Sequence, residues 1–151
     1  MQTNPDFKEF FESFNTHSVR YLVVGGYAVI YHTEPRATVD IDVLIEATPE
    51  NAKRVMAALA SFGFEGIGLK EADFSTPGQT VQLGYPPNRI DINTSITGVG
   101  FEEAYARRCA SSYGGVPVAY IGAEELLRNK EAVGRDKDRL DAKLLRRKLK
   151  P

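Results

Sequence analysis

Apolar and acidic residues alternate one by one over residues 39–45. Valine or isoleucine occupies every odd position of this segment, and Asp40 and Asp42 occupy two of the even positions between them. Successive side chains of a strand point to opposite faces, so the pattern predicts a half-buried strand. The apolar set faces a core, and the two aspartates therefore lie side by side on the other face.

Helical spacing of apolar residues predicts two amphipathic helices in the first half of the chain. The first covers residues 5–16 and carries a buried aromatic stripe. The second covers residues 49–62, with Thr48 as its N-cap and Gly63 as its C-cap. The stripe of the first helix consists of four phenylalanines, Phe7, Phe10, Phe11 and Phe14.

The C-terminal part of the chain is predicted to be helical. One helix starts at Gly122 with acidic residues in its first turn and ends at Gly134. Asp136 is the expected N-cap of the last helix. Shorter helices are predicted over residues 27–31 and 101–108. The apolar stripe expected for the last helix consists of Leu140, Leu144, Leu145 and Leu149.

Short apolar runs predict the remaining strands. Residues 21–24 form a strand that ends at a glycine pair, and residues 116–121 form another. Residues 80–83 and 89–93 form a hairpin around a long turn. In the second strand of this hairpin, Arg89, Asp91 and Asn93 share one face. Residues 65–78 have no clear period and are expected to be a weak strand and loop beside the site.

The composition favours one globular domain and limits the metals that it can bind. The chain has 151 residues, of which 42% are hydrophobic and 26% charged, which suits a single domain over residues 1–151. Cys109 is the only cysteine and there are two histidines, so a bound metal needs oxygen ligands, which favours Mg²⁺ or Mn²⁺. No membrane span or signal pattern is found, and a cytoplasmic location is expected.

The charge is distributed unevenly along the sequence. Residues 1–127 carry nine basic and sixteen acidic side chains, whereas residues 128–151 carry ten basic and four acidic ones. A basic segment on an acidic body favours contact with a polyanion, either a triphosphate or a nucleic acid, although a solvated helix face has the same composition.

Two short motifs carry the candidate chemistry. The like charges of Asp40 and Asp42 repel each other unless a cation lies between them, so the two residues offer half of a divalent-metal site. Gly25 and Gly26 follow an apolar strand and precede a helix, where bare backbone N–H groups can bind phosphate. The sequence contains no GxxxxGK[ST] motif, which excludes a P-loop.

These motifs resemble the signature of the nucleotidyltransferase superfamily that includes DNA polymerase β. The match comprises Gly25–Gly26, the DxD pair Asp40 and Asp42, and residues 36–38 before that pair, and it is most similar to the small AbiEii-like and DUF6036-like proteins of toxin–antitoxin systems. The resemblance implies an α/β (α+β) fold with a small twisted mixed sheet, helices on one face and a basic helical C-terminal portion over about residues 122–151.

The resemblance also implies a set of site residues. Asp91 is the expected third carboxylate, so that Asp40, Asp42 and Asp91 hold Mg²⁺ or Mn²⁺ and perform catalysis; Asp73 is the fallback for the third position. Asp138 and Asp141 belong to the basic helical motif, where they either orient its bases or pair with Lys137. The residues expected to bind the nucleotide are Gly25, Gly26, Arg36, Thr38, Lys130, Arg135 and Lys137.

The implied activity is metal-dependent transfer of a nucleoside monophosphate from a nucleoside triphosphate to an acceptor hydroxyl. The acceptor is an RNA such as tRNA, a protein side chain or a small molecule, and a toxin–antitoxin system implies a partner protein. Two alternatives stay open: a catalytically silent binding module or antitoxin with the same fold, and a metal-dependent phosphohydrolase, which also uses clustered carboxylates.

Overall fold

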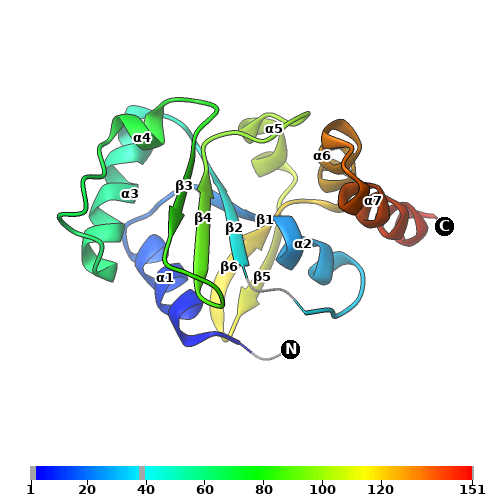
Figure 1. The fold of residues 1–151 in the computed structure, drawn as a ribbon, viewed down its shortest axis with the longest axis horizontal. Coiled ribbons are helices and arrows are strands. Elements are labelled where there is room, and N and C mark those ends of the chain that lie inside the picture. The colour runs from blue at the N-terminus through cyan, green and yellow to red at the C-terminus, as the bar shows by residue number, and fades with distance from the viewer. Residues whose placement is uncertain (1–2, 38–39, 151) are drawn as a thin grey trace.

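A computed structural model describes residues 3–37 and 40–150, and it contains one mixed six-stranded sheet (Figure 1). The strand order is β3-β4-β2-β1-β6-β5. The central strand β2 runs antiparallel to β1 and parallel to β4, and β1 runs parallel to β6. The strands are β1 (Tyr21–Val24), β2 (Asp40–Ile45), β3 (Thr80–Leu83), β4 (Arg89–Asn93), β5 (Cys109–Tyr113) and β6 (Val116–Tyr120).

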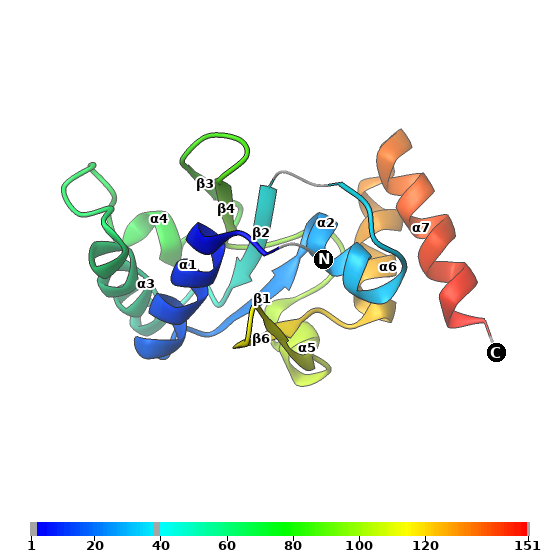
Figure 2. The same ribbon diagram turned by 90° about the horizontal axis from the view of Figure 1, so that it is seen from below.

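The helices lie on both sides of this sheet. Figures 1 and 2 show α1, α3 and α4 on one side, and α6 and α7 on the other. The expected small mixed sheet with packed helices is thus confirmed, but the helices are not confined to one face. The helices are α1 (Pro5–Thr16), α2 (Gly25–His32), α3 (Pro49–Phe62), α4 (Ala72–Ser75), α5 (Phe101–Ala106), α6 (Ala123–Val133) and α7 (Asp136–Leu149).

The core forms between α1, α3 and the apolar face of the central strands. All four phenylalanines of the α1 stripe are buried, as predicted. The ring of Tyr21 on β1 stacks on Phe11 and meets the edge of Phe14, with ring centroids 6.0 and 5.3 Å apart. Because Tyr21 pairs with Ile45, this is also the face of Ile41, Val43 and Ile45. Asp40 and Asp42 therefore lie on the opposite face.

Local signals for helix ends agree with the structure in α3. The hydroxyl of Thr48 accepts a hydrogen bond from the backbone N–H of Asn51, and Gly63 ends the helix with a φ of 106°. These are the predicted N-cap and C-cap, and they explain why the bounds of this helix were predictable from the sequence.

Several predicted elements differ from the structure. Residues 65–78 contain the short helix α4 instead of a weak strand, and α4 packs against α3, away from the acidic strand face. The predicted helix 101–108 ends at Ala106, and β5 follows it in a segment where no strand was predicted. The N-cap of α7 is Arg135, and Asp136 is the first helical residue.

The apolar stripe predicted for α7 is confirmed only in part. Leu145 is buried and Leu144 is half-buried, but Leu140 and Leu149 are 67% and 39% exposed. The helix instead buries Asp138 and Asp141, together with Ala142 and Leu145. None of the described helices is long and apolar enough to cross a membrane.

Candidate active site

Pairing of β2 with β4 brings the predicted carboxylates together. The two strands are parallel and in register, so Asp42 lies beside Asp91 and Asp40 lies beside Arg89. Neighbouring strands are about 4.8 Å apart, which places these four side chains on one face within contact distance. The three aspartates expected from the sequence therefore form one acidic cluster.

Arg89 lies between two of these carboxylates. Its Nη2 donates hydrogen bonds to Asp40 Oδ2 at 2.7 Å and to Asp91 Oδ2 at 3.3 Å, and its Nε lies 3.2 Å from Asp91 Oδ1. The other oxygen of each carboxylate, Asp40 Oδ1 and Asp91 Oδ1, is buried without a hydrogen-bond partner among the described residues. Unpartnered buried oxygens are costly and are the type of ligand that Mg²⁺ prefers.

Asp42 has no ion pair with a described residue. Burial, followed by the nearby charges of Asp91 and Asp40, raises the pKa of its carboxyl to about 6, whereas Lys130 acts in the opposite direction. A divalent cation at this position would stabilise the ionised form of the Asp42 carboxyl, because it offsets the repulsion from the neighbouring carboxylates. The described residues contain no group of three or more histidine, cysteine, aspartate or glutamate side chains arranged to hold a metal ion.

Gly25 brings the start of α2 directly against Asp42. It has a φ of 64°, and a Cβ atom at this position would lie 2.9 Å from both Cβ and Cγ of Asp42. Only glycine fits this conformation and this close approach without strain. The N-cap of α2, Val24, makes no side-chain hydrogen bond, so the first N–H groups of the helix remain available to an anion.

A cleft of about 280 Å³ opens beside Asp42. Gly25, Gly26 and Asp42 line one part of it, and Lys130, Arg135 and Lys137 of the C-terminal portion line another part. Asp40, Asp91 and Arg36 are not among its lining residues. The cleft also contains polar residues that sequence reasoning missed, because no motif marks them: Asn93, Ser95, Thr97 and Asn129.

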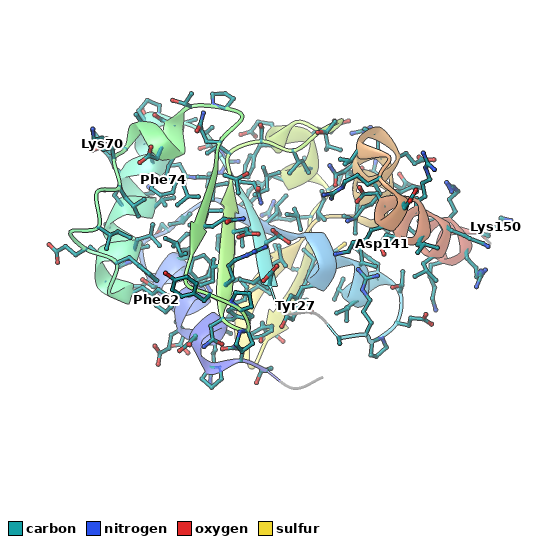
Figure 3. All side chains as sticks on the ribbon, viewed as in Figure 1. Tyr27, Phe62, Lys70, Phe74, Asp141 and Lys150 are labelled. Carbon is teal, nitrogen blue, oxygen red and sulfur yellow. The ribbon has the colours of Figure 1, made fainter. Side chains whose placement is uncertain are left out.

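Ion pairs hold the C-terminal helices in place beside the cleft. The buried Lys130 of α6 has its Nζ 3.3 Å from Asp138 Oδ1 and 3.4 Å from Asp141 Oδ2 of α7. Arg135 pairs with Asp138 at 2.7 Å. Arg36, in the segment between α2 and β2, pairs with Asp141 at 2.5 and 3.3 Å. Figure 3 shows Asp141 on the side of α7 that is turned toward α2.

Asp138 and Asp141 thus hold the side chains of Lys130, Arg135 and Arg36 in place. Lys137 forms no ion pair with any residue that the structure describes. Burial by itself raises the pKa of both carboxyls, but their cationic partners hold each pKa below its ordinary value. The pairing explains why two aspartates can be buried in a helix. Thr38, the other residue expected to contact the nucleotide, lies outside the described residues.

Comparison with known proteins gives structural similarity only. No family model matches the chain, and no curated protein matches it significantly. Among solved structures, the antibiotic-resistance factor ANT(2'')-Ia superposes with a TM-score of 0.57 and 14% sequence identity, covering 96% of this chain and 83% of the other. The lincosamide antibiotic adenylyltransferase LnuA, solved with lincomycin bound, superposes with a TM-score of 0.56 and 16% identity, covering 95% and 96%.

The chain has a nucleotidyltransferase-like fold. A second structure of ANT(2'')-Ia, in complex with adenylyl-2''-tobramycin, has a TM-score of 0.56 and 13% identity over 95% of this chain and 87% of the other. The similarity extends over nearly the whole chain, so the strands that carry the acidic cluster and the C-terminal helices both belong to the shared fold.

Proposed function

We propose that this protein is a metal-dependent nucleotidyltransferase that transfers a nucleoside monophosphate from a nucleoside triphosphate to an acceptor hydroxyl and releases pyrophosphate. The observation that carries the proposal is the acidic cluster of Asp40, Asp42 and Asp91, with two unpartnered buried oxygens, next to a cleft that also holds the start of α2 and Lys130. The fold shared with two antibiotic nucleotidyltransferases supports it.

The two buried carboxylate oxygens without a hydrogen-bond partner, Asp40 Oδ1 and Asp91 Oδ1, suit a divalent cation. Mg²⁺ or Mn²⁺ held by Asp40, Asp42 and Asp91 would neutralise phosphate charge and activate the attacking hydroxyl. Asp91 is the ligand that we assign to the acceptor side, because it lies on β4, whereas Asp40 and Asp42 both lie on β2. Removal of the cation by a chelator should therefore abolish transfer.

The cleft provides the groups that bind the triphosphate. The free N–H groups at the start of α2, which begins with Gly25 and Gly26, are suited to bind a phosphate. Lys130, Arg135 and Lys137 also line the cleft, and their positive charge would offset the charge of the transferred phosphate. Arg36 acts indirectly, because its guanidinium is bound to Asp141 and thereby fixes α7 beside the segment that leads to β2.

The exposed side of α7 favours an anionic acceptor such as an RNA or a tRNA. Four cations recur at helical spacing on α7, and the C-cap Lys150 extends them to a cationic stripe, in which Arg139 pairs with Asp136 and Arg146 with Glu131: Arg139, Lys143, Arg146, Arg147 and Lys150. All five are exposed, and Lys150 projects away from the body (Figure 3). Eleven helical residues span about 17 Å, enough for several phosphates of one strand. The alternative acceptors are a protein side chain or a small molecule, the latter being what the structural neighbours bind. The proposal also includes a partner protein of a toxin–antitoxin pair.

A labelled-nucleotide assay tests this function. The purified chain is incubated with each α-labelled nucleoside triphosphate, Mg²⁺, and either RNA, protein or small-molecule fractions, beside Asp42→Asn and the control Asp73→Asn. Asp73 accepts a hydrogen bond from the backbone N–H of Lys70 and lies on α4, so its loss leaves the cleft intact. The parent and the control Asp73→Asn should transfer label to one of the fractions, and Asp42→Asn should transfer it to none. Free monophosphate without an acceptor would indicate a hydrolase, and binding without turnover a silent binding module.

A further inference from the structure

Arg89 occupies an unusual place for an arginine next to a candidate metal site. Its side chain is 31% exposed and contacts two less exposed carboxylates, those of Asp40 at 23% and Asp91 at 10%. One carboxylate belongs to the neighbouring strand β2 and the other to its own strand β4. Among the described residues, no other lysine or arginine forms an ion pair with either aspartate. Arg89 therefore neutralises the cluster in this structure.

The neutralisation is incomplete. Each aspartate gives one oxygen, Oδ2, to a hydrogen bond with Nη2, while both Oδ1 atoms and the Nε of Arg89 are buried without a hydrogen-bond partner among the described residues. The Nε lies 3.2 Å from Asp91 Oδ1 and attracts it through charge alone. Two oxygens thus remain to attract a further cation, but the guanidinium between them repels any cation that approaches.

We propose that Arg89 is a displaceable counter-ion of the acidic cluster, which holds Asp40 and Asp91 together in the metal-free protein and must release them when a divalent cation binds. The inference rests on the proposed function and assigns a positioning role to a residue outside the metal-ligand set. A long side chain that is one-third exposed can leave the cluster without a change in the strands. Arg89 and the cation then compete for the same two carboxylates, and each lowers the other's occupancy.

The test is a titration with Mn²⁺ alone, measured by calorimetry at pH 8. The proteins are the parent, Arg89→Gln, Arg89→Lys and Arg107→Gln. Arg107 is a matched control, because it also bridges two carboxylates, those of Glu124 and the buried Glu125, both at 2.9 Å. Melting temperatures with a chelator and with saturating Mn²⁺ are recorded in parallel.

Arg89→Gln should bind Mn²⁺ roughly tenfold more tightly than the parent, the factor expected for loss of one strong competing ion pair. It should also melt at a lower temperature in chelator and regain stability with Mn²⁺. Arg89→Lys, whose single ammonium cannot match the fork of a guanidinium, should fall between the two. Arg107→Gln should bind Mn²⁺ as the parent does.

Unchanged or weaker Mn²⁺ binding by Arg89→Gln overturns the inference, even if the parent binds Mn²⁺ and transfers nucleotide. If Arg89→Gln fails to fold in chelator, the Arg89→Lys titration decides by the same criterion. Absence of Mn²⁺ binding in all four proteins overturns both this inference and the proposed metal-dependent function. The two failures are therefore distinguishable.

Discussion

Substitution of Gly25 by alanine should disable the site more than it destabilises the fold. Two physical effects add at this position. A non-glycine residue in the left-handed region costs about 1–2 kcal/mol. The new methyl group would also lie 2.9 Å from Cβ and Cγ of Asp42, so the start of α2 must shift and the carboxylate must rotate; an off-rotamer side chain alone costs about 0.5–1.5 kcal/mol more. The free energy of unfolding should fall by about 1.5–3.5 kcal/mol.

The control for this experiment is Gly66→Ala. Gly66 has a φ of 80°, and no atom lies within 4 Å of the place that an alanine methyl group would take, so this variant carries the backbone cost without the contact. For a chain of this size, 1 kcal/mol corresponds to about 2–4 °C, and Gly25→Ala should melt about 3–14 °C below the parent. Displacement of a metal ligand by about 1 Å should lower transfer at least about 10²-fold.

The assay is single-turnover nucleotide transfer, with Mn²⁺ titration, at a temperature where both variants are folded. Gly66→Ala should transfer nucleotide and bind Mn²⁺ as the parent does, because it lies in the loop after α3. If Gly25→Ala matches Gly66→Ala in both measurements, the close packing of α2 on Asp42 has no role in the site. The reasoning from the glycine geometry would then be refuted.

Four further predictions follow from the same geometry. Saturating Mg²⁺, at about one hundred times its Kd, should add about 2.7 kcal/mol to the free energy of unfolding, and Asp40→Asn should remove this gain in a thermal-shift assay. Asp91→Asn should retain triphosphate binding but slow single-turnover transfer about 10²- to 10⁴-fold; near-normal transfer would reduce Asp91 to an ordinary strand residue. In chelator, the pKa of Asp42, raised from 3.8 to about 6, makes the folded state bind its proton more tightly than the unfolded state. As the pH rises from about 4 to 6, the free energy of unfolding should therefore fall by on the order of 3 kcal/mol because of this carboxyl. Denaturation curves of Asp42→Asn, recorded over the same pH range, should lack this fall. If the acceptor is RNA, Lys143→Ala with Arg147→Ala should weaken RNA binding and reduce the slope of log K against log[salt] by about 1.4–1.8. An unchanged slope would mean that the cationic stripe is only a solvated helix face.

Elements whose signals are local were predictable from the sequence. The helix Pro5–Thr16 and the strands Tyr21–Val24 and Arg89–Asn93 have the predicted bounds. In each, the period of apolar residues or the chemistry of a cap decides the conformation over a few neighbouring residues. The same period placed Asp40 and Asp42 on one face and Asp91 on a polar face of its own strand.

The tertiary structure decided which of these faces meet. The register that places Asp42 beside Asp91 comes from the parallel pairing of two strands that are more than forty residues apart in the sequence, and no local pattern encodes it. The role of Arg89 is also visible only there, because its partner Asp40 lies on another strand. A polar residue on a strand gives the same sequence pattern whether solvent or a carboxylate faces it.

The last helix shows the physical limit most clearly. Its leucines suggested a buried apolar stripe, yet the buried face carries Asp138 and Asp141. Burial of a carboxylate is unfavourable unless a cation accompanies it, and the cations come from elsewhere, Lys130 on α6 and Arg36 between α2 and β2. Hydrophobic periodicity measures the transfer of one segment out of water. It contains no information about charged side chains that a distant segment of the chain contributes. Here those side chains, Lys130 and Arg36, allow the face of α7 with Asp138 and Asp141 to be buried.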